Sequence, residues 1–472
     1  MITYDIITNM EEKRMLEVNK KKKFTSVQIT AVSFLVLILI GGFLLSLPIC
    51  NEKPITYIDA LFTAVSSVCV TGLSTIVAAE QFTFWGELIM LILIQIGGLG
   101  FMTFVTLIFV FFKKRITLKE RIMLGDSFGS NALKGLVHLT KRVFSYTVIL
   151  EIIGAILIAI RTIPMYGIKS GIWRAIFLSI SSFCNAGFDL FGGSSLINFA
   201  TDKLICTVVM VLTVLGGLGF LVWNEVRDKI EYKIKNKTSF RKMISTYSVH
   251  TKFVFAMTAI LILLGTIGLF FAEYNNKETI ADMNFGDKVY VSLFQSVNAR
   301  TTGITSVPTA ELSPASKIIT IILMFIGGAP GSTAGGIKCV TFGLLAMTVF
   351  SVILNEKHVN IFKREIPEEL IKKAIALLFL ALTLVILTTI VLTITEKNID
   401  TLNLAFESVS AFSTCGLSAG VTSSLSLIGK IMIMLLMYSG RVTTITMTMA
   451  IFKSRMKEHD VLRYTQEEIM IG

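Results

Sequence analysis

The chain repeats one short motif four times at nearly equal intervals. The copies read LFTAVSSVCVTG at 61–72, FLSISSFCNAG at 177–187, LFQSVNARTTG at 293–303 and FESVSAFSTCG at 406–416. Their final glycines lie 115, 116 and 113 residues apart. A second glycine-rich patch follows each copy, at 97–100, 216–219, 327–328 and, in weaker form, 439–440. Because internal repetition indicates a fold assembled from equivalent units, the sequence predicts four units.

The composition places these units in a membrane. Of 472 residues, 53% are hydrophobic and 16% are charged, whereas soluble domains carry about 25% charged residues. Apolar stretches of about 20 residues can span a bilayer. The sequence predicts eight spans, two in each unit: 27–47, 88–112, 143–160, 205–223, 253–271, 318–354 with a break after 326, 375–392 and 427–452.

The positive charges indicate the orientation of the spans. The net charge is +12, and 31 of the 44 Lys and Arg residues fall in the segments 1–26, 113–142, 227–252, 353–373 and 453–472. Short loops rich in Lys and Arg remain in the cytoplasm, so we expect both termini there. This distribution explains the basic balance without a nucleic-acid partner. The apolar run after Lys20–Lys23 is too long for a signal peptide, which favours an uncleaved first span.

Each unit is expected to contain a span, a short pore helix, a glycine loop and a second span. The predicted divisions are a cytoplasmic N-terminal segment (1–26), four units (27–112, 143–226, 249–354 and 370–452) and a cytoplasmic tail (453–472). The short helices are expected at 59–67, 173–182, 287–297 and 402–412. Segments of this length cannot cross a bilayer, so they are expected to re-enter it.

Four re-entrant loops imply a shared water-filled axis. Irregular backbone at membrane depth is tolerated only where it is buried in protein or lines an aqueous cavity. The four short-helix C-termini would direct their partial negative charges at one point, and loop carbonyls would replace the hydration shell of a monovalent cation. The predicted fold class is therefore an all-α integral membrane protein with four tandem units arranged pseudo-fourfold around one central pore.

The four motifs resemble those of the Trk/Ktr/HKT superfamily of potassium transporters. The resemblance rests on VCVTG, CNAGF, NARTTG and FSTCGLS, on GGLGF after the first two copies, and on GGAPGSTAGG after the third. It covers about 27–452. Because only about 26 residues precede the first span, we expect no additional N-terminal hairpin, and the resemblance is closest to the bacterial Ktr membrane subunits.

The resemblance implies a potassium-selectivity filter formed by the four loops. Its residues would be Val70, Thr71, Gly72, Asn185, Ala186, Gly187, Thr301, Thr302, Gly303, Thr414, Cys415 and Gly416. Potassium would bind the backbone carbonyls of Gly72, Gly187, Gly303 and Gly416. Members that prefer sodium often replace the first filter glycine with serine, so Gly72 favours potassium as the substrate.

The resemblance also implies a gate below the filter. The gate would consist of an intramembrane loop, Lys338 and Arg441; the loop residues are Gly327, Gly328, Ala329, Pro330, Gly331, Ser332, Thr333, Ala334, Gly335 and Gly336. The residues themselves support a break here, because proline and five glycines cannot continue a helix. An intramembrane arginine is costly and usually faces a cavity. Arg441 is therefore expected to act as an electrostatic barrier.

Partners are implied by the same resemblance. It implies a homodimer, regulated by a cytoplasmic ring of nucleotide-binding Ktr proteins, with sodium as activator in many members and no other cofactor. The segments 113–142 and 227–252 are the expected docking surfaces. The chain shows no cluster of nucleophiles or metal ligands typical of a membrane enzyme, and its repeats run in one direction, unlike those of an inverted-repeat transporter. A sodium-preferring or unselective uniporter remains the alternative.

Several residues allow two interpretations. The GGLG patches are expected to be helix-packing contacts. Arg300 is expected to point behind the filter toward an acidic partner, with Glu407 as a candidate. Asp189 either attracts cations in an outer vestibule or caps a loop. Glu151 is expected to pair with a neighbouring helix, and a metal site at Cys69 and Cys184 would need a further ligand.

Overall fold

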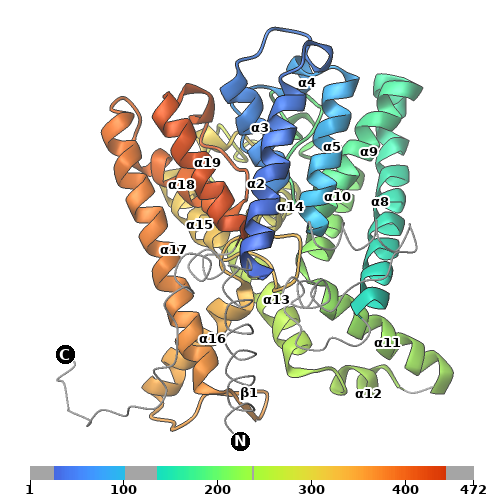
Figure 1. Ribbon diagram of the computed structural model, residues 1–472. Helices are drawn as coiled ribbons and strands as arrows, with labels where there is room; N and C mark the ends of the chain where they lie inside the picture. The colour runs from blue at the N-terminus through green and yellow to red at the C-terminus, as the bar shows by residue number, and fades with distance from the viewer. Residues whose placement is uncertain (1–25, 101–135, 237–238, 443–472) are drawn as a thin grey trace, which may run out of the picture.

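The computed structural model describes residues 26–100, 136–236 and 239–442 (Figure 1). Within these residues the chain is mostly helical, and β1 (Asn360–Ile361) and β2 (Arg364–Glu365) form one short antiparallel hairpin. Nearly all of the predicted segment 1–26, most of 113–142, the tail 453–472 and the ends of the first and fourth predicted units lie outside the described residues.

The helices follow the predicted order of long helix, short helix and further helix. The long helices are α2 (Ser26–Leu45), α8 (Leu136–Tyr166), α13 (Val249–Glu273) and α17 (Glu368–Thr395). The short helices of the four motifs are α3 (Tyr57–Cys69), α9 (Ile168–Cys184), α14 (Phe285–Asn298) and α18 (Thr401–Ser413). The helices after the motifs are α5 (Phe84–Leu99), α10 (Lys203–Gly217), α15 (Pro314–Phe325) and α19 (Leu427–Val442).

Further elements complete the described chain. They are α4 (Ala78–Gln81), α11 (Phe220–Asn236), α12 (Phe240–Ser245), α16 (Cys339–Ile353) and the 3-10 turns η1 (Pro48–Cys50), η2 (Ile197–Phe199), η3 (Thr309–Glu311) and η4 (Thr422–Ser424). The break between α15 and α16 spans 326–338 and coincides with the glycine- and proline-rich segment in which the sequence predicts one.

Four of the described helices are long and apolar enough to cross a membrane: α2, α8, α13 and α17. Each of them precedes one copy of the motif. Their outward faces carry exposed hydrophobic side chains, such as Phe43, Ile156, Leu263 and Phe379. Of the helices after the motifs, α5 and α15 are shorter apolar helices, and α10 is one member of a bent pair. A large exposed apolar surface of this kind is what a lipid environment favours, as in a multi-pass membrane protein.

The second predicted unit contains a break that the sequence analysis missed. A single span was expected over 205–223, but α10 ends at Gly217 and α11 leaves it at an angle of 98°. Gly219 lies between the two helices with φ +91°, a conformation that side-chain-bearing residues rarely adopt. The carbonyls of Gly216 and Gly217 accept hydrogen bonds from Thr333 N and Ala329 N. These bonds to a distant loop stabilise the break.

The four short helices are too short to cross a membrane. They contain 13, 17, 14 and 13 residues, somewhat more than the ten expected. A helix of 13 residues is only about 20 Å long, so it cannot cross a hydrocarbon core of about 30 Å. The N-termini of α3 and α18 are capped by the side chains of Thr56 and Asp400, which satisfies backbone N–H groups of the first turn.

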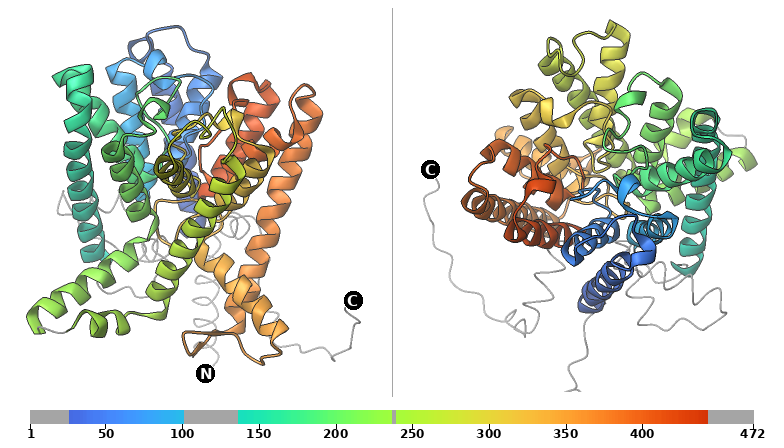
Figure 2. Two further views of the ribbon diagram at one scale, coloured as in Figure 1. Left: turned by 180° about the vertical axis from the view of Figure 1, so that it is seen from behind. Right: turned by 90° about the horizontal axis from the view of Figure 1, so that it is seen from above.

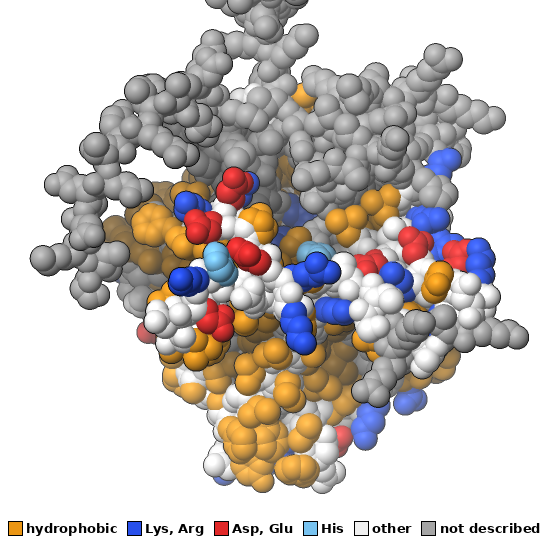
Figure 3. Space-filling view, turned by 90° about the horizontal axis from the view of Figure 1, so that it is seen from below, with side chains coloured by type: hydrophobic (Ala, Val, Ile, Leu, Met, Phe, Trp, Pro, Cys, Tyr) orange, Lys and Arg blue, Asp and Glu red, His pale blue; other side chains and the backbone are white. Residues whose placement is uncertain are grey.

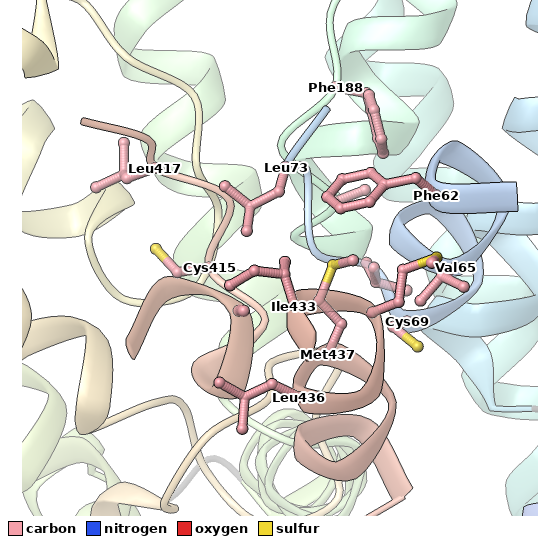
Figure 4. Close-up of a cluster of buried hydrophobic side chains, with 14 of the residues drawn as sticks. Phe62, Val65, Cys69, Leu73, Phe188, Cys415, Leu417, Ile433, Leu436 and Met437 are labelled. Carbon is pink, nitrogen blue, oxygen red and sulfur yellow. The ribbon is translucent and has the colours of Figure 1, made fainter. Parts of the chain in front are cut away.

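The elements follow one another around the molecule in chain order. Seen from above, the colour runs round the centre from blue through green and yellow to orange and red (Figure 2). The helix after each motif packs against the next short helix: α5 on α9, α10 on α14, α15 on α18 and α19 on α3. Ile433 and Met437 of α19 lie beside Val65 and Cys69 of α3 in the largest buried cluster (Figure 4). The end of the described chain thus packs against its beginning.

The lower end of the molecule is polar. Seen from below, acidic and basic side chains gather between flanks of hydrophobic side chains (Figure 3). Arg142 forms an ion pair with Asp228 at 3.2 Å, and Glu225 of α11 accepts hydrogen bonds from Ser248 and Thr251 at the start of α13. These bonds fix the part of 227–252 that joins the second and third units.

Candidate functional site

The four motif glycines lie together and contact one another in a closed cycle. A Cβ atom built on Gly72 would lie 2.7 Å from Ala186 O, and one on Gly187 would lie 2.6 Å from Thr302 O. The same construction on Gly303 gives 2.3 Å to Cys415 O, and on Gly416 it gives 2.1 Å to Thr71 O. Each glycine therefore faces the carbonyl that precedes the next glycine. We call the twelve residues 70–72, 185–187, 301–303 and 414–416 the loop ring.

All four loops share one strained backbone conformation. The residue two positions before each glycine is left-handed, with φ of 58° at Val70, 59° at Asn185, 74° at Thr301 and 48° at Thr414. Three of these residues are β-branched, and for such side chains this region is a genuine outlier. The glycines that follow also have positive φ, between 72° and 99°. Strain of this kind clusters at functional sites, so the loop ring is a candidate site on backbone geometry alone.

In three of the four loops, a serine six positions before the motif glycine accepts a hydrogen bond from a loop N–H group. Gly72 N donates to Ser66 Oγ at 3.0 Å, and Gly416 N donates to Ser410 Oγ at 3.1 Å. In the second loop, Phe188 N donates to Ser181 Oγ at 3.1 Å. The third loop has Val297 at this position, and Gly303 N donates to Asn298 O instead. Sequence analysis did not assign these serines, although alignment of the four motifs places them in register.

Buried polar atoms without a hydrogen-bond partner concentrate in the loop ring. Among the described residues, Thr71 Oγ1, Asn185 Oδ1, Thr302 Oγ1 and Thr414 Oγ1 are buried and have no partner. Folded proteins leave few buried polar atoms unsatisfied, so each such group calls for an explanation. Four of them within one ring of twelve residues distinguish this region from an ordinary packed core.

The 327–336 loop lies against the ends of the short helices. Gly335 is so close to the fourth motif that a Cβ atom would lie 2.1 Å from Thr414 Oγ1. Thr333 Oγ1 donates to Phe183 O at 3.3 Å, near the end of α9. The two ends of the loop are bridged, since Gly327 N donates to Ile337 O at 2.8 Å and Ile337 N donates to Phe325 O at 3.2 Å. The loop thus covers the loop ring from the side of the helix C-termini.

The broken helix of the second unit also holds this loop. Besides the bonds to Gly216 and Gly217, Phe220 N donates to Gly331 O at 2.9 Å. A Cβ atom on Gly219 would lie 2.7 Å from Pro330 O. The GGLG patch at 216–219 was expected to be a helix-packing contact; it packs closely, and it also ends α10 and anchors the loop.

Arg441 reaches the loop from α19. Its guanidinium donates to Thr333 O in the loop, to Gly97 O and, at 3.3 Å, to Gly98 O near the end of α5. Lys338 Nζ donates to Ala334 O at 2.5 Å. The structure therefore brings every predicted gate residue into one contiguous region below the loop ring.

Polar contacts link each unit to the next at the outer ends of the helices. Glu87 accepts from Trp173 Nε1 at 2.6 Å, Thr207 and Tyr290 share a bond of 2.8 Å, and Lys317 donates to Asn403 at 3.0 Å. Lys430 donates to Asp59 at 2.7 Å, between the fourth unit and the first. In each of these contacts a short helix meets the helix that follows the preceding motif.

One predicted pairing is wrong, because Arg300 does not contact Glu407. The Arg300 side chain is buried, and Nη1 donates to Thr258 O at 3.5 Å. Glu407 is occupied by Ser418, Ala419 and Thr422 of its own unit. These nearby donors satisfy both carboxylate oxygens and leave no reason for a distant cation.

Asp189 and Glu151 adopt the local roles that were considered for them. Asp189 caps its loop by accepting from Phe191 N at 2.9 Å and Ser195 Oγ at 2.5 Å. Glu151 contacts neighbouring helices, accepting from Gln95 Nε2 at 3.3 Å and from Cys184 Sγ at 3.9 Å.

Comparisons with known proteins place this geometry in a family. The family model described as TrkH, a cation transport protein, matches residues 7–461. Ktr system potassium uptake protein B of Bacillus subtilis (strain 168) is 36% identical over 97% of this chain and 99% of that protein. Potassium/sodium uptake protein NtpJ of Enterococcus hirae is 37% identical over 96% of this chain and 98% of that protein.

A solved structure shares the fold. The crystal structure of the potassium transporter TrkH from Vibrio parahaemolyticus matches with a TM-score of 0.71, over 93% of this chain and 87% of that one, at 16% sequence identity. The resemblance read from the four motifs is therefore confirmed.

Proposed function

Because this chain belongs to the TrkH family of cation transport proteins, we propose that it carries potassium across the cell membrane through the loop ring. The family and the relatives are cation transporters and not enzymes. Potassium is proposed as the substrate, since two relatives are named as uptake proteins for it. Transport would be passive, along the electrochemical gradient of the ion.

The observation that carries this proposal is the closed cycle of glycines and carbonyls. Four loops from one chain meet so that each glycine faces the carbonyl preceding the next glycine. A ring of backbone carbonyls can replace the hydration shell of an alkali cation. The proposed filter comprises the loop ring, with potassium at the carbonyls of Gly72, Gly187, Gly303 and Gly416.

The short helices support a cation at this place. The C-terminus of an α-helix carries about half a negative charge, and α3, α9, α14 and α18 all end within a few residues of the loop ring. Their summed partial charges stabilise a cation at the centre and oppose an anion. The four units are accordingly proposed to surround one pore in pseudo-fourfold fashion.

The gate is proposed to be the 327–336 loop together with Lys338 and Arg441. The loop lies against the C-terminal ends of the short helices, and Arg441 binds the carbonyl of Thr333 within it. A fixed positive charge below a cation filter raises the barrier to permeation. Movement of the loop would require the hydrogen bonds that join it to Gly216, Gly217 and Arg441 to rearrange.

The proposed setting is a cell membrane crossed several times, with both termini in the cytoplasm. The eight spans predicted from the sequence and the distribution of Lys and Arg support this topology. We also propose a homodimer that is regulated by a cytoplasmic nucleotide-binding ring. The naming of relatives as members of a Ktr system supports a further component, and the segments 113–142 and 227–252 are its proposed docking surfaces.

A sodium-preferring or unselective uniporter is the second candidate. The name of the Enterococcus hirae relative, a potassium/sodium uptake protein, supports this second candidate. Gly72 opposes it, because by resemblance a serine at this position accompanies sodium preference. Activation by sodium, as distinct from its transport, is a separate proposal.

Ion flux into proteoliposomes tests both candidates. We expect the purified protein to pass potassium faster than sodium and Gly72→Ser to reduce that difference. The protein should also restore growth of a potassium-uptake-deficient strain at limiting potassium. Equal potassium and sodium flux would replace the first candidate by the second, and absence of either flux in correctly folded protein would refute both.

A further inference from the structure

Each loop continues outward from its glycine, and a polar side chain of its own short helix holds that continuation. Asp59 accepts from Thr75 Oγ1 at 2.7 Å in the first unit, and Arg174 donates to Leu190 O in the second. Gln295 is bonded to Thr305 at 3.1 Å in the third, in either orientation of its amide. Thr75 and Leu190 lie three positions after their glycines and Thr305 lies two after its glycine, and the segment held in the fourth unit begins two positions after Gly416. We call these polar side chains anchors; they are Asp59, Arg174, Gln295 and, in the fourth unit, Glu407. All four hold the stretch just after the motif glycine, but they differ in charge and in hydrogen-bonding groups.

The fourth anchor, Glu407, makes more bonds than the others to the segment that follows its glycine. Its Oε1 accepts from Ser418 Oγ and from Ala419 N at 3.1 Å, and its Oε2 accepts from Thr422 Oγ1 at 3.0 Å. Ser418 and Thr422 are also joined to each other at 2.9 Å, and Gly420 N donates to Ser418 Oγ at 2.9 Å. One carboxylate thus organises the whole 418–422 segment, which begins two residues after Gly416.

The carboxylate is not required by the repeated fold. The residues at the corresponding position, nine before the glycine, are Thr63, Leu178 and Phe294 in the other units. All four side chains are fully buried. Burying a carboxylate is costly unless its oxygens are satisfied, and here every bond that satisfies them comes from the segment that follows the filter glycine. The location of these donors indicates that the carboxylate of Glu407 holds this segment in place.

We propose, on the basis of the proposed function, that Glu407 is a positioning residue for ion selectivity that fixes the fourth loop through Ser418, Ala419 and Thr422. The carbonyl of Gly416 lies between Cys415, whose thiol donates to Ala299 O at 3.3 Å, and the segment that Glu407 holds. Leu417, in the same stretch, is buried and belongs to the cluster drawn in Figure 4. A loop held on both sides cannot follow a smaller ion inward, which disfavours sodium relative to potassium.

Two possible roles of the Glu407 side chain can be separated by experiment: holding the loop through hydrogen bonds and attracting cations through its negative charge. In Glu407→Gln the amide oxygen still accepts from Ser418 and Ala419, and the amide nitrogen donates to Thr422 Oγ1, which can act as acceptor. The bonds persist while the negative charge is lost. In Glu407→Ala both are lost. A positioning role therefore predicts rescue by glutamine, whereas direct attraction of cations by the carboxylate predicts that glutamine and alanine behave alike.

The experiment measures potassium and sodium flux into proteoliposomes for the full-length protein and its variants. Glu407→Ala is expected to lower the potassium-to-sodium flux ratio by about tenfold, equivalent to about 1.4 kcal/mol, while Glu407→Gln keeps the ratio of the unsubstituted protein. Glu396→Ala is the matched control, since this buried glutamate of the same unit holds Ser426, at the start of α19. It is expected to leave the ratio unchanged.

The outcomes separate this inference from the proposed function. An unsubstituted protein without potassium selectivity overturns both. A selective protein whose ratio is unchanged in Glu407→Ala, or equally reduced in Glu407→Gln, overturns the positioning role alone. If Glu407→Ala does not fold, the double variant Ser418→Ala, Thr422→Val removes two of the donors and decides the matter by the same ratio.

Discussion

Lys430 Nζ donates a hydrogen bond to Asp59 Oδ1 at 2.7 Å, and the two residues are 371 positions apart in the sequence. Both side chains are mostly buried, at 17% and 16% exposure. Asp59 also accepts from Thr75, which follows the first motif glycine, Gly72. The pair therefore closes the circle of units and reaches the first loop at the same time.

Removing the Lys430 ammonium should destabilise the fold. Lys430→Met is expected to lower the free energy of unfolding by about 1–3 kcal/mol, because it leaves a mostly buried carboxylate without its cation. Unfolding in mixed micelles measures this. A double-mutant cycle with Asp59→Asn should give a coupling of about 0.5–3 kcal/mol. Lys235→Met, which breaks an exposed pair with Glu231, should change stability by no more than about 0.5 kcal/mol, and an equal effect of the two methionine variants would contradict the prediction.

A side chain at a glycine of the loop ring should strongly reduce potassium flux. In Gly416→Ala the added Cβ atom would lie 2.1 Å from Thr71 O at a φ of +91°, so the carbonyl of the neighbouring loop must move. We expect potassium flux to fall by about tenfold or more, which needs only about 1.4 kcal/mol. Gly167→Ala is the control, because Gly167 has a φ of +78° but nothing within 4 Å of its Cβ position. The Gly167→Ala variant places a side chain at a positive φ but makes no close contact, so it should retain flux.

Arg441 should limit flux through the proposed gate. Arg441→Ala removes a positive charge and the bonds to Thr333 O and Gly97 O, so potassium flux should rise on the order of tenfold. Single-channel or proteoliposome recordings measure the change. Arg161→Ala, which removes an exposed arginine paired with Asp202 at 3.1 Å, should leave flux unaltered. Unchanged flux and unchanged gating in Arg441→Ala would refute the barrier role.

Two neighbouring glycines in the broken helix should respond differently to substitution. A Cβ atom on Gly217 would have its nearest neighbour at 3.7 Å, whereas one on Gly219 would lie 2.7 Å from Pro330 O at a φ of +91°. Gly217→Ala is therefore expected to preserve gating, and Gly219→Ala is expected to displace the 327–336 loop and change the open fraction. Flux measured with both variants at equal expression tests the difference. Similar behaviour of the two would argue against anchoring of the loop at Gly219.

The local sequence was sufficient to predict the loops and the break after α15. Each loop needs glycine at positive φ, and Pro330 with its neighbouring glycines cannot continue a helix, so both features are encoded where they occur. The order of helices followed from the spacing of the four motifs. The serines Ser66, Ser181 and Ser410 were visible in the alignment of these motifs, but their hydroxyls were not assigned to the loop N–H groups.

The break between α10 and α11 could not be predicted in the same way. GGLGF occurs at both 97–101 and 216–220, and both α5 and α10 end within it, but the sequence pattern alone does not show the sharp bend between α10 and α11. At 216–219 the decisive bonds come from Ala329 and Thr333, more than 100 residues away. The Arg300–Glu407 pairing failed for the opposite reason, because matching opposite charges ignored the donors only 11–15 residues from Glu407.

The closed cycle of four loops lies within a single polypeptide, and this has a consequence for how the protein can vary. In an assembly of four identical chains every substitution is copied to all quarters of the ring. Here one substitution alters one quarter, so the residues three before the glycines can be Cys69, Cys184, Arg300 and Ser413 without any common rule. If the loop ring is the filter proposed above, ion preference can be tuned by small independent steps, each changing a fraction of the environment of the ion.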